Sequence, residues 1–118
     1  MIDRNATSLT DSDTNATLNV IVRRIVESYQ PEKIILFGSY AYGQPHSDSD
    51  FDLLIIKQTN ERPIDRRVAV RTLLRPFKPH PAVSPIVVTQ DEIAERLEMG
   101  DPFAEEIVTR GRILYAQS

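Results

Sequence analysis

The chain contains no cysteine, which excludes disulfide bonds and zinc sites built on cysteine ligands. It also has no apolar segment long enough to span a membrane. Residues 1–13 are mostly polar and lack the apolar core of a secretory signal peptide. From these absences we expect a cytoplasmic protein.

The sequence also has no excess of basic residues. The 118 residues include 14 Lys and Arg against 17 Asp and Glu, a formal net charge of -3. This balance argues against direct nucleic-acid binding, which normally requires a basic surface. Neither a Gly-Lys-Ser/Thr phosphate loop nor a G-x-G-x-x-G dinucleotide fingerprint occurs, so kinase-like and dinucleotide-binding folds have no support.

The length suits one domain with one core. We expect a flexible lead-in over residues 1–13 and a single domain over residues 14–118. Apolar residues at helical spacing predict an amphipathic first helix from Leu18 to Tyr29. Two continuous apolar runs, at 33–37 and at about 50–57, predict strands that lie in the centre of a sheet.

The second half of the chain carries start signals for three helices. These are a cap at Thr59 or Asn60 with Pro63 in the first turn, a capping box from Thr89 to Glu92, and Asp101 before Pro102. Further strands are predicted over residues 83–88 and 112–115. The alternation of helices and strands predicts an α+β fold, a small mixed β-sheet with helices layered against it.

Residues 38–52 carry the most informative pattern. Gly38-Ser39 follows the first predicted strand, and Asp50 and Asp52 open the second. Glycine lets the backbone approach phosphate oxygens, and Ser39 is expected at the N-terminus of a short helix, which favours an anion. We expect the two aspartates to share one strand face, where paired carboxylates suit a Mg²⁺ ion that also binds phosphates. Each part alone has an ordinary explanation as a turn or polar loop, but their combination at this spacing favours nucleotide chemistry.

This pattern resembles the signature of the DNA polymerase beta-type nucleotidyltransferase superfamily. It is most similar to the smallest branch, the minimal nucleotidyltransferases (MNT proteins), many of which resemble the antitoxin of HEPN/MNT toxin–antitoxin pairs. The resemblance covers residues from about 18 to 115 and implies a nucleotidyltransferase fold.

The resemblance also implies the chemistry. Asp50 and Asp52 would be catalytic and would bind Mg²⁺, with Mn²⁺ as an alternative, while Gly38, Ser39 and Ser49 would bind the nucleotide. ATP would be the substrate, and AMP would pass to a hydroxyl on a HEPN-type partner toxin, in a hetero-oligomer.

The family normally carries a third carboxylate on the next strand, and here that position falls at Ser84. Serine is a weak metal ligand and no base at neutral pH. Pro85 follows it and lacks a backbone donor, so the strand is expected to begin there or to lie at an edge. Three interpretations stay open: slow catalysis with one tightly bound metal, replacement of the missing group by His80 or Asp91, or a binding subunit without turnover.

Five arginines recur along the helix predicted after residue 60. They are Arg62, Arg66, Arg67, Arg71 and Arg75. The last three are spaced by four and share one face. A solvated face is the preferred interpretation, and a docking stripe for an acidic partner or RNA is the alternative.

Overall fold

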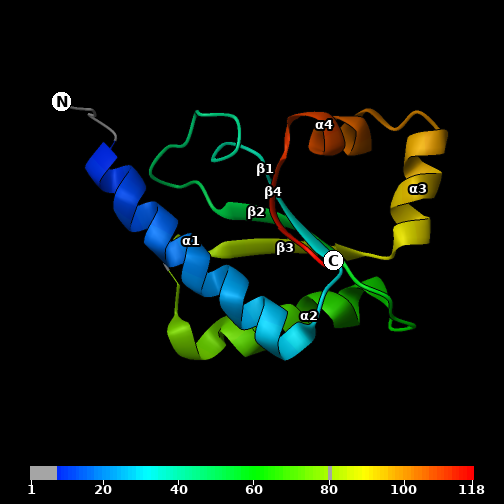
Figure 1. Ribbon diagram of the computed structural model, residues 1–118, viewed down its shortest axis with the longest axis horizontal. Helices are drawn as coiled ribbons and strands as arrows, with labels where there is room; N and C mark the ends of the chain where they lie inside the picture. Colours follow the sequence, from blue (N-terminus) through cyan, green and yellow to red (C-terminus); the bar gives the residue numbers. More distant parts are fainter. Residues whose placement is uncertain (1–7, 80) are drawn as a thin grey trace.

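The computed structural model describes residues 8–79 and 81–118, which form a small sheet between two helical layers (Figure 1). The elements in chain order are α1 (Ser8–Tyr29), β1 (Lys33–Phe37), β2 (Phe51–Ile56), α2 (Pro63–Leu74), the 3-10 helix η1 (Arg75–Phe77), β3 (Val83–Val88), α3 (Gln90–Glu98), α4 (Pro102–Arg110) and β4 (Arg112–Ala116). α1 begins at Ser8, so residues 8–13 of the expected lead-in are helical. The remaining residues of the expected lead-in, 1–7, lie outside the described residues.

The four strands form one mixed sheet in the order β3-β2-β1-β4. β1 pairs antiparallel with β2 and β4, whereas β2 pairs parallel with β3. Except for Lys33 and Asp52, every residue of β1 and β2 is buried, as expected for strands covered on both faces. The prediction that these two strands are central is therefore confirmed. β3, which contains Pro85, lies at an edge, as predicted.

Alternate residues of the central strands build two cores on opposite faces of the sheet. The first core contains Leu18, Ile21, Ile25, Ile34, Leu36, Phe51, Leu53, Ile55, Val70, Leu74 and Val87. The second contains Ile35, Phe37, Leu54, Ile56, Ile93, Ala104 and Ile107. Thus α1 and α2 cover one face and α3 and α4 the other (Figure 1), which confirms the predicted α+β architecture. None of the helices in the described part of the chain has the length and apolar character needed to cross a membrane.

Two helix starts follow their sequence signals. The Thr89 hydroxyl accepts a hydrogen bond from the Glu92 N–H at 3.1 Å, and the Glu92 carboxylate accepts one from the Thr89 N–H at 2.8 Å. This is the predicted capping box. At α4, the Asp101 carboxylate accepts a bond from the Phe103 N–H at 2.9 Å, which confirms the second predicted start.

The start of α2 differs from the prediction. Its N-cap is Arg62, which makes no side-chain capping bond, so the cap expected at Thr59 or Asn60 is wrong. Pro63 occupies the first turn as expected. Its fixed φ and its missing N–H suit the first helical position without a capping side chain.

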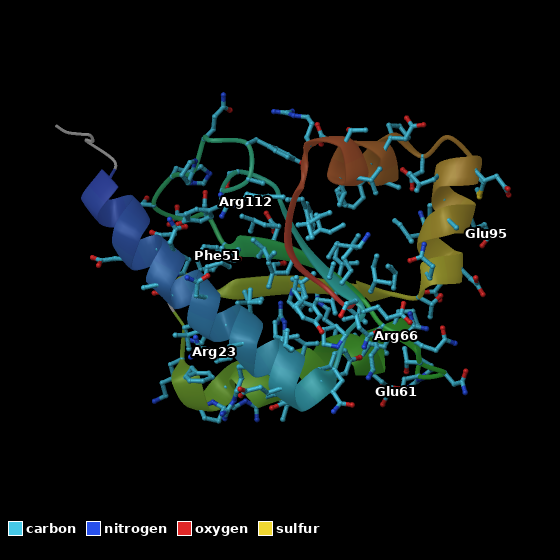
Figure 2. The ribbon with its side chains drawn as sticks, in the orientation of Figure 1. Arg23, Phe51, Glu61, Arg66, Glu95 and Arg112 are labelled. Carbon is cyan, nitrogen blue, oxygen red and sulfur yellow. The ribbon has the colours of Figure 1, made fainter. Side chains whose placement is uncertain are left out.

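Arg66 is buried, whereas the preferred interpretation placed the arginines of α2 on a solvated face. Its side chain is 6% exposed and donates hydrogen bonds to the Glu61 carbonyl at 2.8 Å and to Glu92 Oε1 at 2.7 Å. It also donates to the Val87 carbonyl at 3.3 Å. Because Glu92 caps α3, this ion pair joins α2, β3 and α3 (Arg66 and Glu61 are labelled in Figure 2). The bond from Arg66 holds the pKa of Glu92 below its usual value.

We predict that Arg66→Ala lowers the free energy of unfolding by about 3 kcal/mol, because it leaves Glu92 and two carbonyls without their donor. Arg67→Ala, one residue further on an exposed position, should change it by less than about 0.5 kcal/mol. Since the pKa of Glu92 is lowered in the folded state, the contribution of the pair is present at neutral pH and is lost as the pH falls. Urea unfolding at neutral and acidic pH measures both effects, and equal losses for the two variants would contradict the assignment.

Candidate active site at the ends of three strands

One end of β1 lies beside one end of β2 and one end of β3, so three strand ends are neighbours at the same end of the sheet. Phe37, the last residue of β1, pairs with Asp52 of β2, and Asp52 pairs on its other side with Ser84 of β3. Gly38 directly follows Phe37. β2 and β3 pair without a register shift along their whole length, so Pro85 does not displace Ser84 from its place beside Asp52. The residues that the sequence analysis selected from three separate segments are therefore neighbours.

Gly38 is required by its backbone and by its surroundings. Its φ of 76° lies in the left-handed region, where a side chain is strained. A Cβ added there would overlap Oδ2 of Asp52 and would lie 3.0 Å from the Asp52 Cγ. The sequence pattern predicts that this glycine lets phosphate oxygens approach the backbone. The structure adds a second reason, which is the room that the Asp52 carboxylate needs.

The segment after Gly38 forms hydrogen-bonded turns, so the short helix expected from Ser39 is wrong. The Tyr42 N–H donates to the Gly38 carbonyl at 3.0 Å, which closes a single helical turn. The chain then reaches Gly43 at a φ of 80°, which cannot continue a helix. Ser39 consequently lies in a tight turn and does not begin a helix.

Three contacts hold the loop between β1 and β2 in place. The Ser49 hydroxyl accepts hydrogen bonds from the Ser39 hydroxyl and the His46 N–H, both at 2.9 Å. Ser49 is 8% exposed, and its hydrogen bonds join residues of the same loop to one another. The Tyr40 ring packs on Phe51 with centroids 4.8 Å apart (Phe51 is labelled in Figure 2). A role for Ser49 in nucleotide binding stays a prediction.

The two aspartates repel each other. Burial raises the pKa of Asp52, and the negative charge of Asp50 raises it further. Asp50 is exposed and precedes β2, which begins at Phe51, so strand alternation fixes the direction of Asp52 only. A partly desolvated carboxylate beside a second negative charge is an environment that a cation stabilises.

The described residues contain no cluster of three or more acidic or histidine side chains suited to a metal ion. Asp50 and Asp52 fit a Mg²⁺ ion nevertheless, because Mg²⁺ is usually held by one or two carboxylates together with water and substrate phosphates. Ser84, for which the resemblance implies the third-carboxylate position, pairs with Asp52. Asp91 lies on α3, beyond the opposite end of β3, so it does not replace that carboxylate. His80 lies outside the described residues.

A groove of about 460 Å³ borders Asp50 on the side of α2 and β3. It is lined by Asp50, Arg71, Leu74, Arg75, Lys78, Pro79, Ala82 and Val83. Two members of the arginine stripe, Arg71 and Arg75, thus line the same groove as Asp50, which sequence spacing alone did not reveal. Lys78 was not selected from the sequence, because only the turn at η1, where Lys78 has a φ of 49°, brings it to the groove.

The family model that describes a nucleotidyltransferase domain matches residues 18–115. Three crystal structures are similar in fold, each covering 85% of this chain. They are the toxin–antitoxin MntA-HpeT with two aspartate-to-glutamate substitutions (19% identity, 73% of that chain, TM-score 0.55), the same pair with a tyrosine-to-alanine substitution (21%, 72%, 0.55), and a toxin–antitoxin with AMP-PNP (21%, 73%, 0.57). At such identities the likeness concerns the fold, and it confirms the predicted one. No curated protein matches the sequence.

We predict that Gly38→Ala costs about 3 kcal/mol of unfolding free energy, from left-handed strain and overlap with Asp52. Gly43→Ala is the matched control, because Gly43 has a similar φ but no neighbour within 4 Å of the added Cβ. It should cost about 1 kcal/mol. Combining Gly38→Ala with Asp52→Ala should recover part of the loss, and denaturant titration of these three variants and of Asp52→Ala alone tests this. If the two substitutions lower the unfolding free energy additively, Asp52 is not the reason that position 38 requires glycine.

Asp52→Asn should raise the melting temperature at neutral pH in the absence of divalent cations. The pKa of Asp52 is raised in the folded state, so its ionised form destabilises the fold above that pKa. As the pH falls through the raised pKa, the native carboxyl takes up a proton and the advantage of the variant should vanish. Thermal unfolding of both proteins across this range is the measurement. A variant less stable than the native protein at neutral pH would disprove the predicted repulsion.

Proposed function

Because the chain belongs to the nucleotidyltransferase domain family, we propose that it transfers AMP from ATP to a hydroxyl group in a Mg²⁺-dependent reaction. The acceptor hydroxyl lies on a HEPN-type partner toxin, and the chain acts as its antitoxin within a hetero-oligomer. The observation that carries this proposal is the contact between Gly38 and Asp52, with Asp50 alongside. This contact supports the proposal because it places the turn that we propose to bind phosphate next to the carboxylate pair.

The proposed reaction forms a bond between the acceptor oxygen and the α-phosphorus and breaks the bond from that phosphorus to pyrophosphate. The acceptor proton leaves to solvent, since Ser84 supplies no base. When bound, Mg²⁺ neutralises charge on the triphosphate and orients it. Asp50 and Asp52 would hold the ion, and the turn at Gly38 and Ser39 would bind phosphate oxygens. The protein contributes chiefly position and charge, which is typical of phosphoryl transfer.

The similar structures support the choice of partner and nucleotide. They concern a toxin–antitoxin pair, and one of them contains AMP-PNP. In another, the two substituted aspartates are separated by a single residue, which is the spacing of Asp50 and Asp52.

Ser84 favours a second candidate function. The serine pairs with Asp52. If residue 84 is the third-carboxylate position, as the resemblance implies, the proposed metal site lacks one negative charge. Chemistry that depends on three carboxylates would be slow or absent there. The alternative is therefore a binding subunit that neutralises or assembles with its partner without nucleotide transfer.

We predict that ATP binds in a Mg²⁺-dependent manner and that Asp50→Asn/Asp52→Asn lowers the affinity at least about tenfold, because the ion loses both protein ligands. Isothermal titration with and without Mg²⁺ measures this. Asp48→Asn, an exposed aspartate of the same loop, is the matched control and should bind as the native protein does. Equal affinity for the native and double-variant proteins would sink the proposed site.

Ser84→Asp should raise AMP transfer by about a hundredfold, because a charge at the third position is worth several kcal/mol in metal-assisted transfer. The unshifted register places the new carboxylate next to Asp52. The assay measures the transfer of labelled AMP to the protein encoded by the adjacent reading frame, which is co-expressed with each variant as the candidate partner. Ser84→Asn is the control for side-chain size. Fast native transfer that Ser84→Asp leaves unchanged would show that another group fills the position. Absence of transfer by all three proteins would favour the binding subunit.

A further inference from the structure

We propose that the groove beside Asp50 binds an acidic segment of the partner protein, and that this segment carries the acceptor hydroxyl. The inference rests on the proposed function and specifies its acceptor. It names three side chains for recognition, Arg71, Arg75 and Lys78, which the family match does not assign to any role.

The position of the groove suits an acceptor. Asp52 has the end of β1, and thus the Gly38 turn, on one side and Ser84 of β3 on the other. Ala82 and Val83, which directly precede Ser84, form part of the groove wall. A triphosphate held at the Gly38 turn and an acceptor held in the groove would approach the carboxylates from opposite sides. Such an arrangement is required when the attacking and leaving oxygens are in line.

The charge of the groove selects an anion. Arg71, Arg75 and Lys78 line it, and only Asp50 opposes them. Among the side chains of residues 13–79 and 81–118, none lies within ion-pair distance of these three cations. An acidic segment would supply carboxylates to them, and arginine forks bind carboxylates with two parallel hydrogen bonds.

Part of the groove lining is apolar. Leu74, which is 3% exposed, contributes to it together with Val83, Ala82 and Pro79. Apolar side chains next to three cations suit an aromatic hydroxyl side chain flanked by carboxylates, as in an acidic segment that contains tyrosine. The volume falls within the range of about 300–1,000 Å³ that is usual for ligand clefts.

A protein segment fits better than a nucleic acid. The chain as a whole is acidic, with a formal net charge of -3, and would repel a long polyanion outside the groove. Three cations in one short groove match a few carboxylates. They do not form the extended basic track that follows a phosphate backbone.

The test uses labelled peptides in which one tyrosine is flanked by glutamates, by glutamines or by lysines, together with a single-stranded oligonucleotide. Fluorescence anisotropy with the full chain should show tightest binding of the glutamate peptide, weakened by salt. Arg71→Glu/Arg75→Glu should reduce this affinity about tenfold, consistent with the loss of two solvent-accessible charge pairs, and should favour the lysine peptide instead.

Arg67→Glu provides the matched control, because Arg67 lies one helical turn from Arg71 and outside the groove. It should leave peptide binding unchanged. Titration with ATP and Mg²⁺ is run in parallel on every variant, and the groove variants should retain native affinity. If the native protein does not bind ATP, this result counts against the proposed function. The peptide series tests the groove independently of ATP binding. Equal binding of the glutamate and glutamine peptides, equal losses in Arg67→Glu and Arg71→Glu/Arg75→Glu, or tighter groove-dependent binding of the oligonucleotide would each overturn the inference.

Discussion

The structure depends on one close approach, that of the Asp52 carboxylate to the backbone of Gly38. It ties the end of β1 to the start of β2 at the point where the loop between them begins and ends. A Cβ at position 38 would occupy the space of Oδ2 of Asp52. The aspartate at position 52 therefore requires the glycine at position 38. A glycine that faces phosphate in the proposed reaction is thus required before any ligand binds.

The same site is a local weakness that the rest of the domain offsets. Asp52 is partly desolvated and faces a second negative charge, which opposes folding at neutral pH. Stability comes from elsewhere: from two apolar cores on the faces of the sheet and from the Arg66–Glu92 pair, which joins α2 to α3. Such a division is common, since groups arranged to bind a cation are poorly arranged for stability without it.

Local signals in the sequence predicted the elements well, and tertiary contacts explain the errors. The continuous apolar runs identified β1 and β2, and Thr89 with Glu92 identified the start of α3, because these patterns are complete within a few residues. Arg66 appeared to be a surface residue because its partner Glu92 is 26 positions away and the periodicity of α2 does not reveal it. The two aspartates were selected from their spacing after Gly38-Ser39, and their role in a site stays a prediction. The groove beside them was not predicted, because it forms only when α2, the turn at Lys78 and the start of β3 come together.

For the proposed transfer of AMP, the charge of the side chain at position 84 matters more than the geometry of the strands that hold it. Pro85 removes a backbone donor, yet β3 lies at an edge, and its pairing with β2 stays in register. Ser84 is therefore held beside Asp52 by the same ladder that would hold an aspartate there. In the proposed metal site, a serine in place of a third carboxylate changes the charge. Two carboxylates repel each other less than three, so the site opposes folding less without a cation, but it also holds a cation less firmly. A site of this kind gains most from a substrate that brings its own anionic ligands, which is what a triphosphate supplies.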